Sequence, residues 1–136
     1  MAKKAAPLMT EGGTLITLTY QGSRKATPWY NVMGVAKAAL ESAVVYLAND
    51  LGPQKIRVNA ISPGPMKTLS GAAIGGARKT FRYTEKNTPL RANATKASIG
   101  GTAVYLASDY GECTTGETIM VDGGLHILSL PQPENF

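Results

Sequence analysis

Short apolar runs, separated by longer mixed segments, divide this chain of 136 residues. Residues 14–19 (TLITLT), 56–61 (IRVNAI) and 118–121 (TIMV) are rich in β-branched side chains and lie between glycine, proline and other turn-forming residues. This pattern predicts three β-strands. Near-continuous apolar runs such as the first and the third are typical of parallel strands that are buried on both faces.

The segments between these runs have helical patterns. Residues 30–51 are dominated by Ala, Leu, Val and Met, and a Gly-Pro pair follows them, which is a stop signal for a helix. Thr95 is a residue type that caps helices, and a second long helix is expected from it to about residue 108. A shorter helix is expected around residues 78–85, and residues 2–9 read as the end of a helix.

Strands and helices alternate along the chain, which implies right-handed crossovers and an α/β fold with helices packed on a parallel sheet. Two segments contain residues that break regular structure. The strand at 56–61 should break sharply at the SPGP sequence of residues 62–65, and LPQPEN at residues 130–135 should form a loose tail or an extended interface arm.

Three parallel strands make a small sheet, and the first strand would expose an unpaired edge. The sequence contains no glycine-rich phosphate-binding loop, and Met1 begins inside a stretch that looks helical. These observations predict that the sheet continues into an N-terminal half that these residues lack. We therefore expect residues 1–136 to be the C-terminal half of a single domain.

Composition narrows the class of protein. The net charge is +5, but the basic residues are dispersed, so nucleic-acid binding is not expected, whereas an acidic protein partner stays open. A membrane protein is not expected either, because no apolar run approaches the ~18–20 residues that a membrane helix needs. A lone cysteine, Cys113, is typical of a reduced cytoplasmic protein. A lone histidine, His126, predicts no metal site and is interpreted as structural.

Tyr30 and Lys37 form the first candidate site. Seven residues apart on a predicted helix, they should lie within roughly 20° of the same face. A lysine ammonium beside a tyrosine hydroxyl lowers the pKa of the phenol, and such a tyrosine can donate a proton or a hydrogen bond to a developing oxyanion. The spacing alone does not separate this pair from a surface pair without function.

The turn after the second strand is the other candidate. Ligands of open parallel sheets bind at the carboxyl ends of strands, and residues 64–68 (GPMKT) follow that end. A rigid proline-containing turn presents backbone groups at fixed positions, and Thr68 adds a hydroxyl for a phosphate or an amide. Judged alone, the turn could equally be one that only ends a strand.

These features together resemble a known family. Residues 30–68 (YNVMGVAKAALESAVVYLANDLGPQKIRVNAISPGPMKT) look like the catalytic core of the short-chain dehydrogenase/reductase superfamily. Most of that superfamily has a Tyr-x3-Lys pair. The wider Tyr-x6-Lys spacing of this chain resembles the divergent branch of bacterial and plastid enoyl-acyl-carrier-protein reductases. LTY at 18–20, NTPL at 87–90 and VDGG at 121–124 also fit that branch. The resemblance runs from about residue 2 to 128 and implies a Rossmann-like, doubly wound sheet, of which this chain holds three parallel strands with crossover helices. It also implies that residues 1–136 are the catalytic half of one reductase domain and that the cofactor-binding, N-terminal half is absent.

The resemblance implies roles for individual residues. Tyr30 would hydrogen-bond the carbonyl of a thioester substrate, and Lys37 would bind the nicotinamide ribose and support Tyr30. Tyr20 would be a second active-site tyrosine, near the acyl chain. The residues expected to be catalytic are therefore Tyr20, Tyr30 and Lys37, and both tyrosines are also expected to bind substrate.

Further roles follow from the same resemblance. The backbone of Met66 would hold the carboxamide of NADH, and Thr68 would contact the pyrophosphate. Ile74 would belong to the substrate-binding loop, and Arg78 and Lys79 to the docking surface for the acidic carrier protein. The full set expected to bind NADH/NAD is Lys37, Pro65, Met66, Lys67, Thr68, Leu69 and Ser70.

The implied reaction is hydride transfer from NADH to C3 of a trans-2-enoyl thioester, with Tyr30 stabilising the enolate oxygen, in fatty acid biosynthesis. The helix at 30–51 is apolar on more than one face, which is typical of a helix buried on both sides and fits the homotetramers of the family.

Two alternatives to this function stay open. Another short-chain reductase, such as a ketoacyl reductase, is disfavoured by the Tyr-x6-Lys spacing and Tyr20. A non-catalytic fragment that keeps an oligomer interface is favoured by the missing glycine-rich loop.

Overall fold

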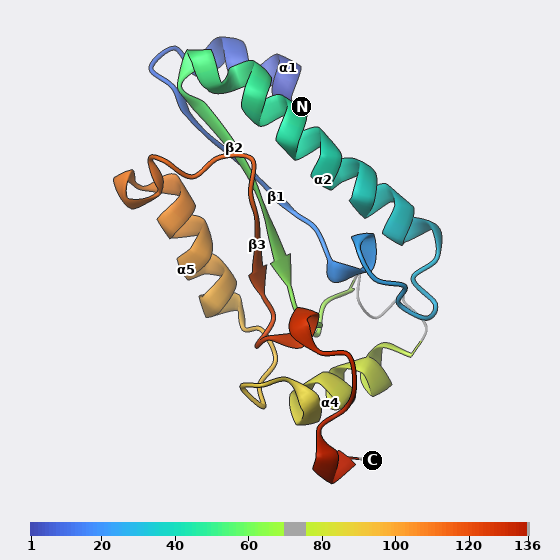
Figure 1. The fold of residues 1–136 in the computed structure, drawn as a ribbon. Helices are drawn as coiled ribbons and strands as arrows, with labels where there is room; N and C mark the ends of the chain where they lie inside the picture. Colours follow the sequence, from blue (N-terminus) through green and yellow to red (C-terminus); the bar gives the residue numbers. More distant parts are fainter. Residues whose placement is uncertain (70–75, 136) are drawn as a thin grey trace.

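In this computed structural model of the chain, the structure describes residues 1–69 and 76–135. A three-stranded sheet lies between two helices, and a third helix lies beyond the carboxyl ends of the strands (Figure 1). The main elements are α1 (Ala2–Ala5), β1 (Gly13–Leu18), α2 (Val32–Leu51), β2 (Ile56–Pro63), α4 (Ala77–Asn87), α5 (Lys96–Ala107) and β3 (Thr118–Val121).

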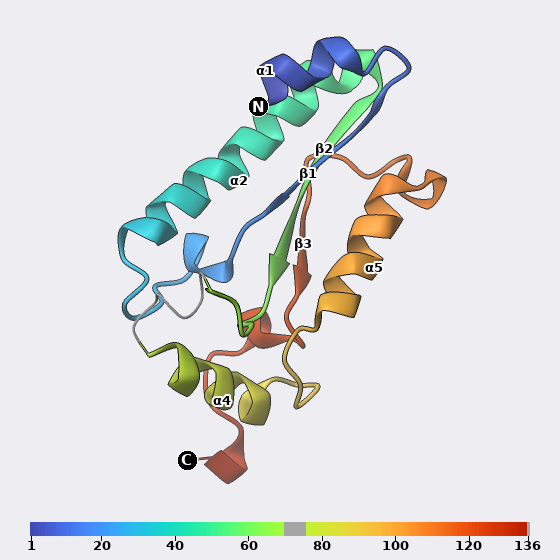
Figure 2. The same ribbon diagram turned by 180° about the vertical axis from the view of Figure 1, so that it is seen from behind.

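The sheet has the order β1-β2-β3, and both strand pairs are parallel. Gly13 pairs with Ile56 at the start of β1, and Ala60 pairs with Thr118 at the start of β3. Helices α2 and α5 lie on opposite sides of the sheet (Figure 2). The predicted α/β fold with three parallel strands and crossover helices is therefore confirmed, and within the described residues β1 is paired on one side only, as expected.

The core lies between α2 and the central strand. Val44 and Ala48 of α2 pack against Val58 and Ala60 of β2, and each of the four side chains is almost fully buried. Burying one valine side chain contributes about 1.5–3 kcal/mol. This contact therefore fixes the helix over the sheet and sets where its first turns lie relative to the strand ends.

Helix α2 begins later than its sequence pattern predicts. Asn31, the N-cap residue, has φ 46° and ψ −127°, which is outside the helical region. Tyr30 therefore lies in the turn before the helix, and the prediction that Tyr30 and Lys37 share one helical face is wrong. The predicted end at Leu51 is confirmed.

The second long helix begins where its cap predicts. The Thr95 hydroxyl accepts a hydrogen bond from the Ser98 backbone N–H, and the Ser98 hydroxyl accepts one from the Thr95 backbone N–H, both at 3.0 Å. This is a reciprocal capping box with serine in the third position. The shorter helix expected around residues 78–85 is also confirmed, because it lies within α4.

One further boundary prediction is wrong, and of the two alternatives expected for residues 130–135 the loose tail is excluded. Strand β2 does not break at residue 62 but continues to Pro63, which pairs with Val121 of β3, and the next N–H, of Gly64, donates to the Val121 carbonyl at 2.9 Å. The C-terminal segment is not a loose tail. Gln132 donates from its backbone N–H to Asn87 Oδ1 at 2.8 Å and from its side chain to the Asn87 carbonyl at 3.0 Å.

One helix segment, Val32–Gln54, is long and apolar enough to cross a membrane by length and composition, in the part of the chain that the structure describes. The core helices of soluble proteins pass the same test. Its inner face packs on β2 through Val44 and Ala48, and its Lys37 and Glu41 side chains bind the end of β1. These contacts are those of a helix that covers a sheet.

Candidate functional site

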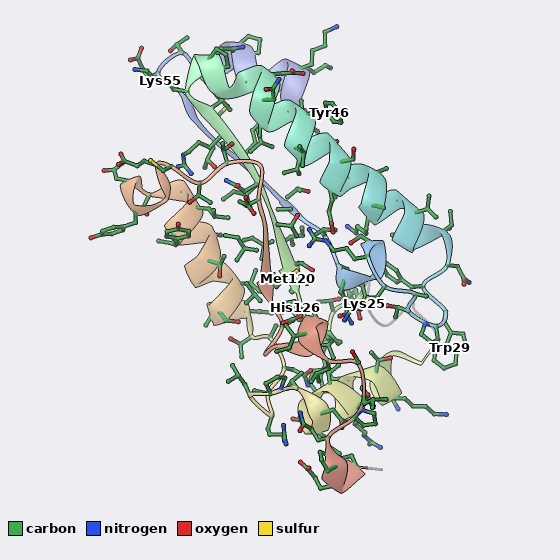
Figure 3. The ribbon with its side chains drawn as sticks, in the orientation of Figure 1. Lys25, Trp29, Tyr46, Lys55, Met120 and His126 are labelled. Atoms are coloured by element: carbon green, nitrogen blue, oxygen red, sulfur yellow. The ribbon has the colours of Figure 1, made fainter. Side chains whose placement is uncertain are left out.

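The candidate site residues follow the carboxyl ends of the strands. Tyr20 comes two residues after β1, residues 64–69 follow β2, and Asp122 follows β3 directly. All three therefore lie at the edge of the sheet where ligands of open α/β folds bind. Figure 3 shows His126 and Lys25 at this end of the molecule, whereas Lys55 lies at the opposite end.

The structure brings Tyr20 and Tyr30 together. Their ring centroids are 5.0 Å apart and the rings are tilted by 59°, a separation typical of favourable aromatic pairs. Tyr30 is only 7% exposed, and Tyr20 is half-buried. Two residues that the sequence separates by a loop therefore form one aromatic unit at the end of β1.

Two glycines make room for the Tyr30 ring. A Cβ atom on Gly22 would lie 2.5 Å from Cδ1 of Tyr30, and a Cβ atom on Gly34 would lie 2.6 Å from the Gly22 carbonyl oxygen. Both distances are too short for a real side chain. The turn after Tyr20 can therefore approach the first turn of α2 closely, with the tyrosine ring beside it.

The backbone on both sides of Tyr30 is unusual. Trp29 has φ 66° and Asn31 has φ 46°, and neither is glycine. Such conformations cost about 1–3 kcal/mol each and persist only where the surrounding structure holds them. Tyr30 therefore enters the site from a strained turn rather than from the regular face of a helix.

Both tyrosines are neutral hydrogen-bond donors at ordinary pH. Burial is the largest cause that raises the pKa of Tyr20; a hydrogen bond with Gln21 opposes it, and the nearby Tyr30 and Asp122 add to it. Burial also raises the pKa of Tyr30. Lys37 is not among the causes that shift the Tyr30 pKa, so the expected lowering by Lys37 is not found; the Lys37 ammonium donates to the Leu18 carbonyl instead.

Lys37 binds the end of β1. Its Nζ donates to the Leu18 carbonyl oxygen at 2.9 Å. One helical turn later, the Glu41 carboxylate binds the next residue of the chain, Thr19, at 2.7 Å. The two charged side chains of α2 thus attach to the two residues that precede Tyr20.

The loop expected to bind the cofactor lies beyond β2. Pro65 and Met66 are half-buried, and Lys67, Thr68 and Leu69 are exposed. The Thr68 N–H donates to the Met66 carbonyl at 3.0 Å, and Lys67 Nζ lies 4.6 Å from the centre of the Phe81 ring. Ser70 and Ile74, also expected in the site, lie outside the described residues.

The basic residues expected to dock the carrier protein lie in the first turn of α4. Arg78 and Lys79 are both exposed. Lys79 also lines an open, mainly apolar hollow of about 320 Å³, together with Tyr20, Trp29, Tyr83 and others. The structure therefore places Lys79 in the same hollow as Tyr20, and Arg78 precedes it in the chain.

His126 has a structural environment. The Asp122 carboxylate accepts hydrogen bonds from the backbone N–H groups of Gly124 and His126, both at 2.9 Å, and lies 3.0 Å from His126 Nδ1. Lys25 Nζ donates to the carbonyl oxygens of His126 and Leu128. Among the described residues no group of three His, Cys, Asp or Glu side chains could hold a metal ion.

Comparison with known proteins identifies the family. The family model described as "Enoyl-(Acyl carrier protein) reductase" matches residues 1–126. The chain belongs to the enoyl-(acyl carrier protein) reductase family. Every element that forms the candidate site lies within the matched residues.

Curated relatives are similar over almost the whole chain. Enoyl-[acyl-carrier-protein] reductase [NADH] 2 of Rhizobium meliloti is 54% identical over 134 residues, which are 98% of this chain and 50% of that protein. An enoyl-[acyl-carrier-protein] reductase [NADH] of Nostoc is 52% identical over 126 residues, which are 93% of this chain and 49% of that protein. The chain thus spans about half the length of the curated relatives it matches.

Solved reductase structures have the same fold. The enzyme of Anaplasma phagocytophilum in complex with NAD superposes with a TM-score of 0.91 at 50% identity, over 98% of this chain and 48% of that one. The Bacillus cereus enzyme with NADP⁺ and an indole naphthyridinone superposes with a TM-score of 0.92 at 53% identity, over 95% of this chain and 50% of that one. The Rossmann-like fold expected from the sequence is therefore confirmed.

For this member of the reductase family, sequence reasoning missed one partly buried polar cluster, centred on Glu41. Glu41 accepts hydrogen bonds from Thr19, Ser23 and Arg24 and is 12% exposed. A signal was present, because Glu41 lies four residues after Lys37 and therefore on the same helical face. The hydroxyl partners could not be inferred, since they belong to a turn whose path the pattern does not predict.

Proposed function

We propose that the protein carrying this chain reduces the trans-2-enoyl double bond of an acyl-carrier-protein thioester with NADH, in fatty acid biosynthesis. The contact between Tyr20 and Tyr30 at the carboxyl edge of the sheet carries this proposal. Both are protonated donors, and the Lys37 ammonium lies at the end of the same strand. Relatives named as NADH-dependent reductases at about half identity support it.

The residues present fit the nicotinamide end of a dinucleotide. Residues 65–69 form a partly exposed loop at the end of the central strand, and Lys37 supplies a cation whose Nζ lies beside the neighbouring strand end. In this proposal Lys37 holds the ribose, Met66 and Thr68 contact the carboxamide and the pyrophosphate, and the stretch extends to Ser70. When bound, NADH supplies the hydride for C3 of the enoyl group.

The chain's own residues stabilise the charge that this addition creates. As C3 gains a hydride, negative charge moves to the thioester oxygen and forms an enolate. Tyr30 donates a hydrogen bond to that oxygen, because burial keeps its phenol protonated. Tyr20, in contact with Tyr30, borders the acyl chain beside the reacting bond. Protonation at C2 then completes the saturated product.

The substrate arrives on an acidic carrier protein. Arg78 and Lys79 are exposed on the first turn of α4, and Lys79 lines the hollow that contains Tyr20. A carrier protein bound there would present its acyl thioester to the tyrosine pair. Ile74, which lies outside the described residues, is proposed to contact the acyl chain.

The proposal includes a homotetramer that works in the cytoplasm. The outer face of α2 exposes Val35 and Tyr46, each 70% exposed, and a second subunit would cover it. The lone Cys113 is a free, exposed thiol, which fits a reducing compartment.

The test measures NADH oxidation with a crotonyl thioester. It uses the 136-residue chain and a hybrid protein, in which the N-terminal half of the Rhizobium meliloti relative precedes this chain. We expect turnover from the hybrid protein, because it also contains the half of the relative that this chain does not span. Equilibrium titration with NADH and a melting curve check that the hybrid protein is folded and binds cofactor.

The outcomes separate the proposal from its alternatives. A folded, NADH-binding hybrid protein that reduces only ketoacyl substrates would identify another short-chain reductase. A hybrid protein that binds NADH and reduces neither substrate would favour the non-catalytic fragment. Turnover by the hybrid protein and none by the 136-residue chain would mean that this chain carries the catalytic residues but needs the N-terminal half for activity.

A further inference from the structure

One carboxylate gathers three donors beside the candidate site. Glu41 Oε1 accepts hydrogen bonds from the Thr19 hydroxyl at 2.7 Å and the Ser23 hydroxyl at 2.5 Å. Glu41 Oε2 accepts one from Arg24 Nε at 3.0 Å. Thr19 is 4% exposed and the Glu41 side chain 12% exposed, whereas the Arg24 side chain is 57% exposed, so the cluster is buried at Thr19 and reaches solvent at Arg24.

The three donors lie on both sides of Tyr20 in the chain. Thr19 precedes it directly, and Ser23 and Arg24 belong to the turn that follows it. That turn is closed by the Ser23 N–H, which donates to the Tyr20 carbonyl at 3.0 Å. The backbone that carries Tyr20 is therefore anchored before and after the ring by a single carboxylate.

The anchor is a carboxylate for a physical reason. It accepts several hydrogen bonds through two oxygens, and charge-assisted bonds are about twice as strong as neutral ones. Its partial burial is tolerated while the hydroxyls and the Arg24 guanidinium compensate the charge. Removing Glu41 would leave the buried Thr19 hydroxyl without this acceptor.

The fold does not need Glu41 to hold α2 on the sheet. Val44 and Ala48 pack on β2, and Lys37 still binds the Leu18 carbonyl one turn earlier. Glu41 instead fixes the backbone path of residues 19–24. This segment brings the Tyr20 ring centroid to 5.0 Å from that of Tyr30.

We infer that Glu41 is a positioning residue for the reduction, holding Tyr20 against Tyr30 without itself contacting the substrate. The inference rests on the proposed function, because it names Tyr20 as the residue on which Glu41 acts. Glu41 is not expected to bind NADH, since its three bonds go to the turn that carries Tyr20.

The test compares variants of the hybrid protein by kinetics. A displacement of about 1 Å at a reacting centre can cost about 100-fold in rate, so we expect Glu41→Ala to lower kcat between about 10- and 100-fold. The Kd for NADH should stay within about twofold, because Lys37 keeps its place. Thr19→Val, which keeps the shape of the side chain but removes the hydroxyl, should lower kcat as well. Thr19→Ser keeps the hydroxyl and should have a kcat close to that of the parent.

A double variant separates positioning from general destabilisation. Glu41→Ala and Thr19→Val share one hydrogen bond, so their combined effect on kcat should be clearly smaller than the product of the single effects. Glu134→Ala is the matched control, because it removes a carboxylate paired with Arg91 at 2.7 Å that has no part in the Glu41 cluster; its kcat should equal that of the parent.

Unchanged kcat in Glu41→Ala or in Thr19→Val, or multiplicative effects in the double variant, would overturn the inference. A parent hybrid protein without turnover would mean instead that the proposed function has failed. Crystal structures of the parent and of Glu41→Ala then decide the positioning. A Tyr20 ring that leaves Tyr30 supports it, and a centroid separation that stays at 5.0 Å refutes it.

Discussion

At the scale of single residues, the turn around Tyr30 combines one buried ring with backbone strain on both sides of it. Trp29 and Asn31 adopt positive φ on either side of it, and Gly22 and Gly34 leave space for its ring. Strain of this kind is kept where a side chain must point in one direction. The turn holds the phenol at a fixed place before the helix begins.

Replacing Tyr30 with Phe tests the role of its hydroxyl. Loss of one preorganised donor to an oxyanion typically lowers kcat by about 100- to 1,000-fold, and we expect a loss in that range for crotonyl thioester reduction by the hybrid protein. The ring and its contact with Tyr20 are retained, so NADH binding should not change. A variant with parent-like kcat would show that the Tyr30 hydroxyl does not stabilise the enolate.

Glu41 also predicts a dependence of stability on pH. Burial opposes ionisation of Glu41, but the hydrogen bonds from Ser23, Thr19 and Arg24 outweigh it and lower the pKa of its carboxyl. A lowered pKa in the folded state contributes stability above the unfolded pKa, and this contribution is lost as pH falls through the folded value.

Glu41→Gln should therefore lose less stability than the parent hybrid protein as the pH falls below about 4.5. Urea denaturation at several pH values measures this, and near neutral pH the variant should be the less stable of the two. Parallel curves for the two proteins would contradict the prediction.

At the scale of elements, the sequence predicted an element boundary correctly where a side chain bonds to backbone only a few residues away. Thr95 caps α5 as expected because its partner, Ser98, is only three residues away. The start of α2 was missed because Asn31 leaves the helical region, although its neighbours favour a helix. Strand β2 passes its expected stop because Pro63 and Gly64 are paired with β3, a contact between distant segments.

The cap of α5 gives a prediction for this element. Thr95→Ala removes the hydroxyl that accepts the Ser98 N–H, and loss of such a cap typically costs about 1 kcal/mol. We expect the free energy of unfolding of the hybrid protein to fall by about that amount in urea denaturation. Thr95→Ser, which keeps the hydroxyl, should stay close to the parent, and an equal loss in both variants would refute the cap as the cause.

The candidate site was predictable only in part. The positions of Tyr20, Tyr30 and Lys37 followed from ordered motifs and a family resemblance. The pairing of the two rings, and the direction of their pKa shifts, depends on burial that no spacing reveals. The partners of Glu41 depend on the three-dimensional path of the turn after β1.

At the scale of the whole molecule, the outer face of α2 is apolar and exposed in this chain. Val35 and Tyr46 lie eleven residues apart and therefore within about 20° of the same helical face. Each is 70% exposed, which fits a surface that another subunit covers.

Val35→Glu should therefore dissociate the proposed tetramer, because a carboxylate buried without a partner is unfavourable. Sedimentation velocity of the hybrid protein should show a shift to smaller species. Lys55→Glu is the control. It also introduces a carboxylate, but at the amino end of β2, and it should leave the assembly intact. A tetramer that survives Val35→Glu would place the interface elsewhere.

The order of the strands also determines how this chain must acquire its structure. The central strand β2 pairs with β1 on one side and with β3 on the other, and each pairing joins segments separated by a long helical crossover. Closing such loops costs entropy before any contact compensates it, so sheets of this kind fold slowly. During synthesis, the edge of β2 that pairs with β3 therefore keeps its backbone N–H and C=O groups unpaired until residue 121 has emerged from the ribosome. In that interval the nascent chain is most exposed to aggregation, and refolding yields should fall as protein concentration rises.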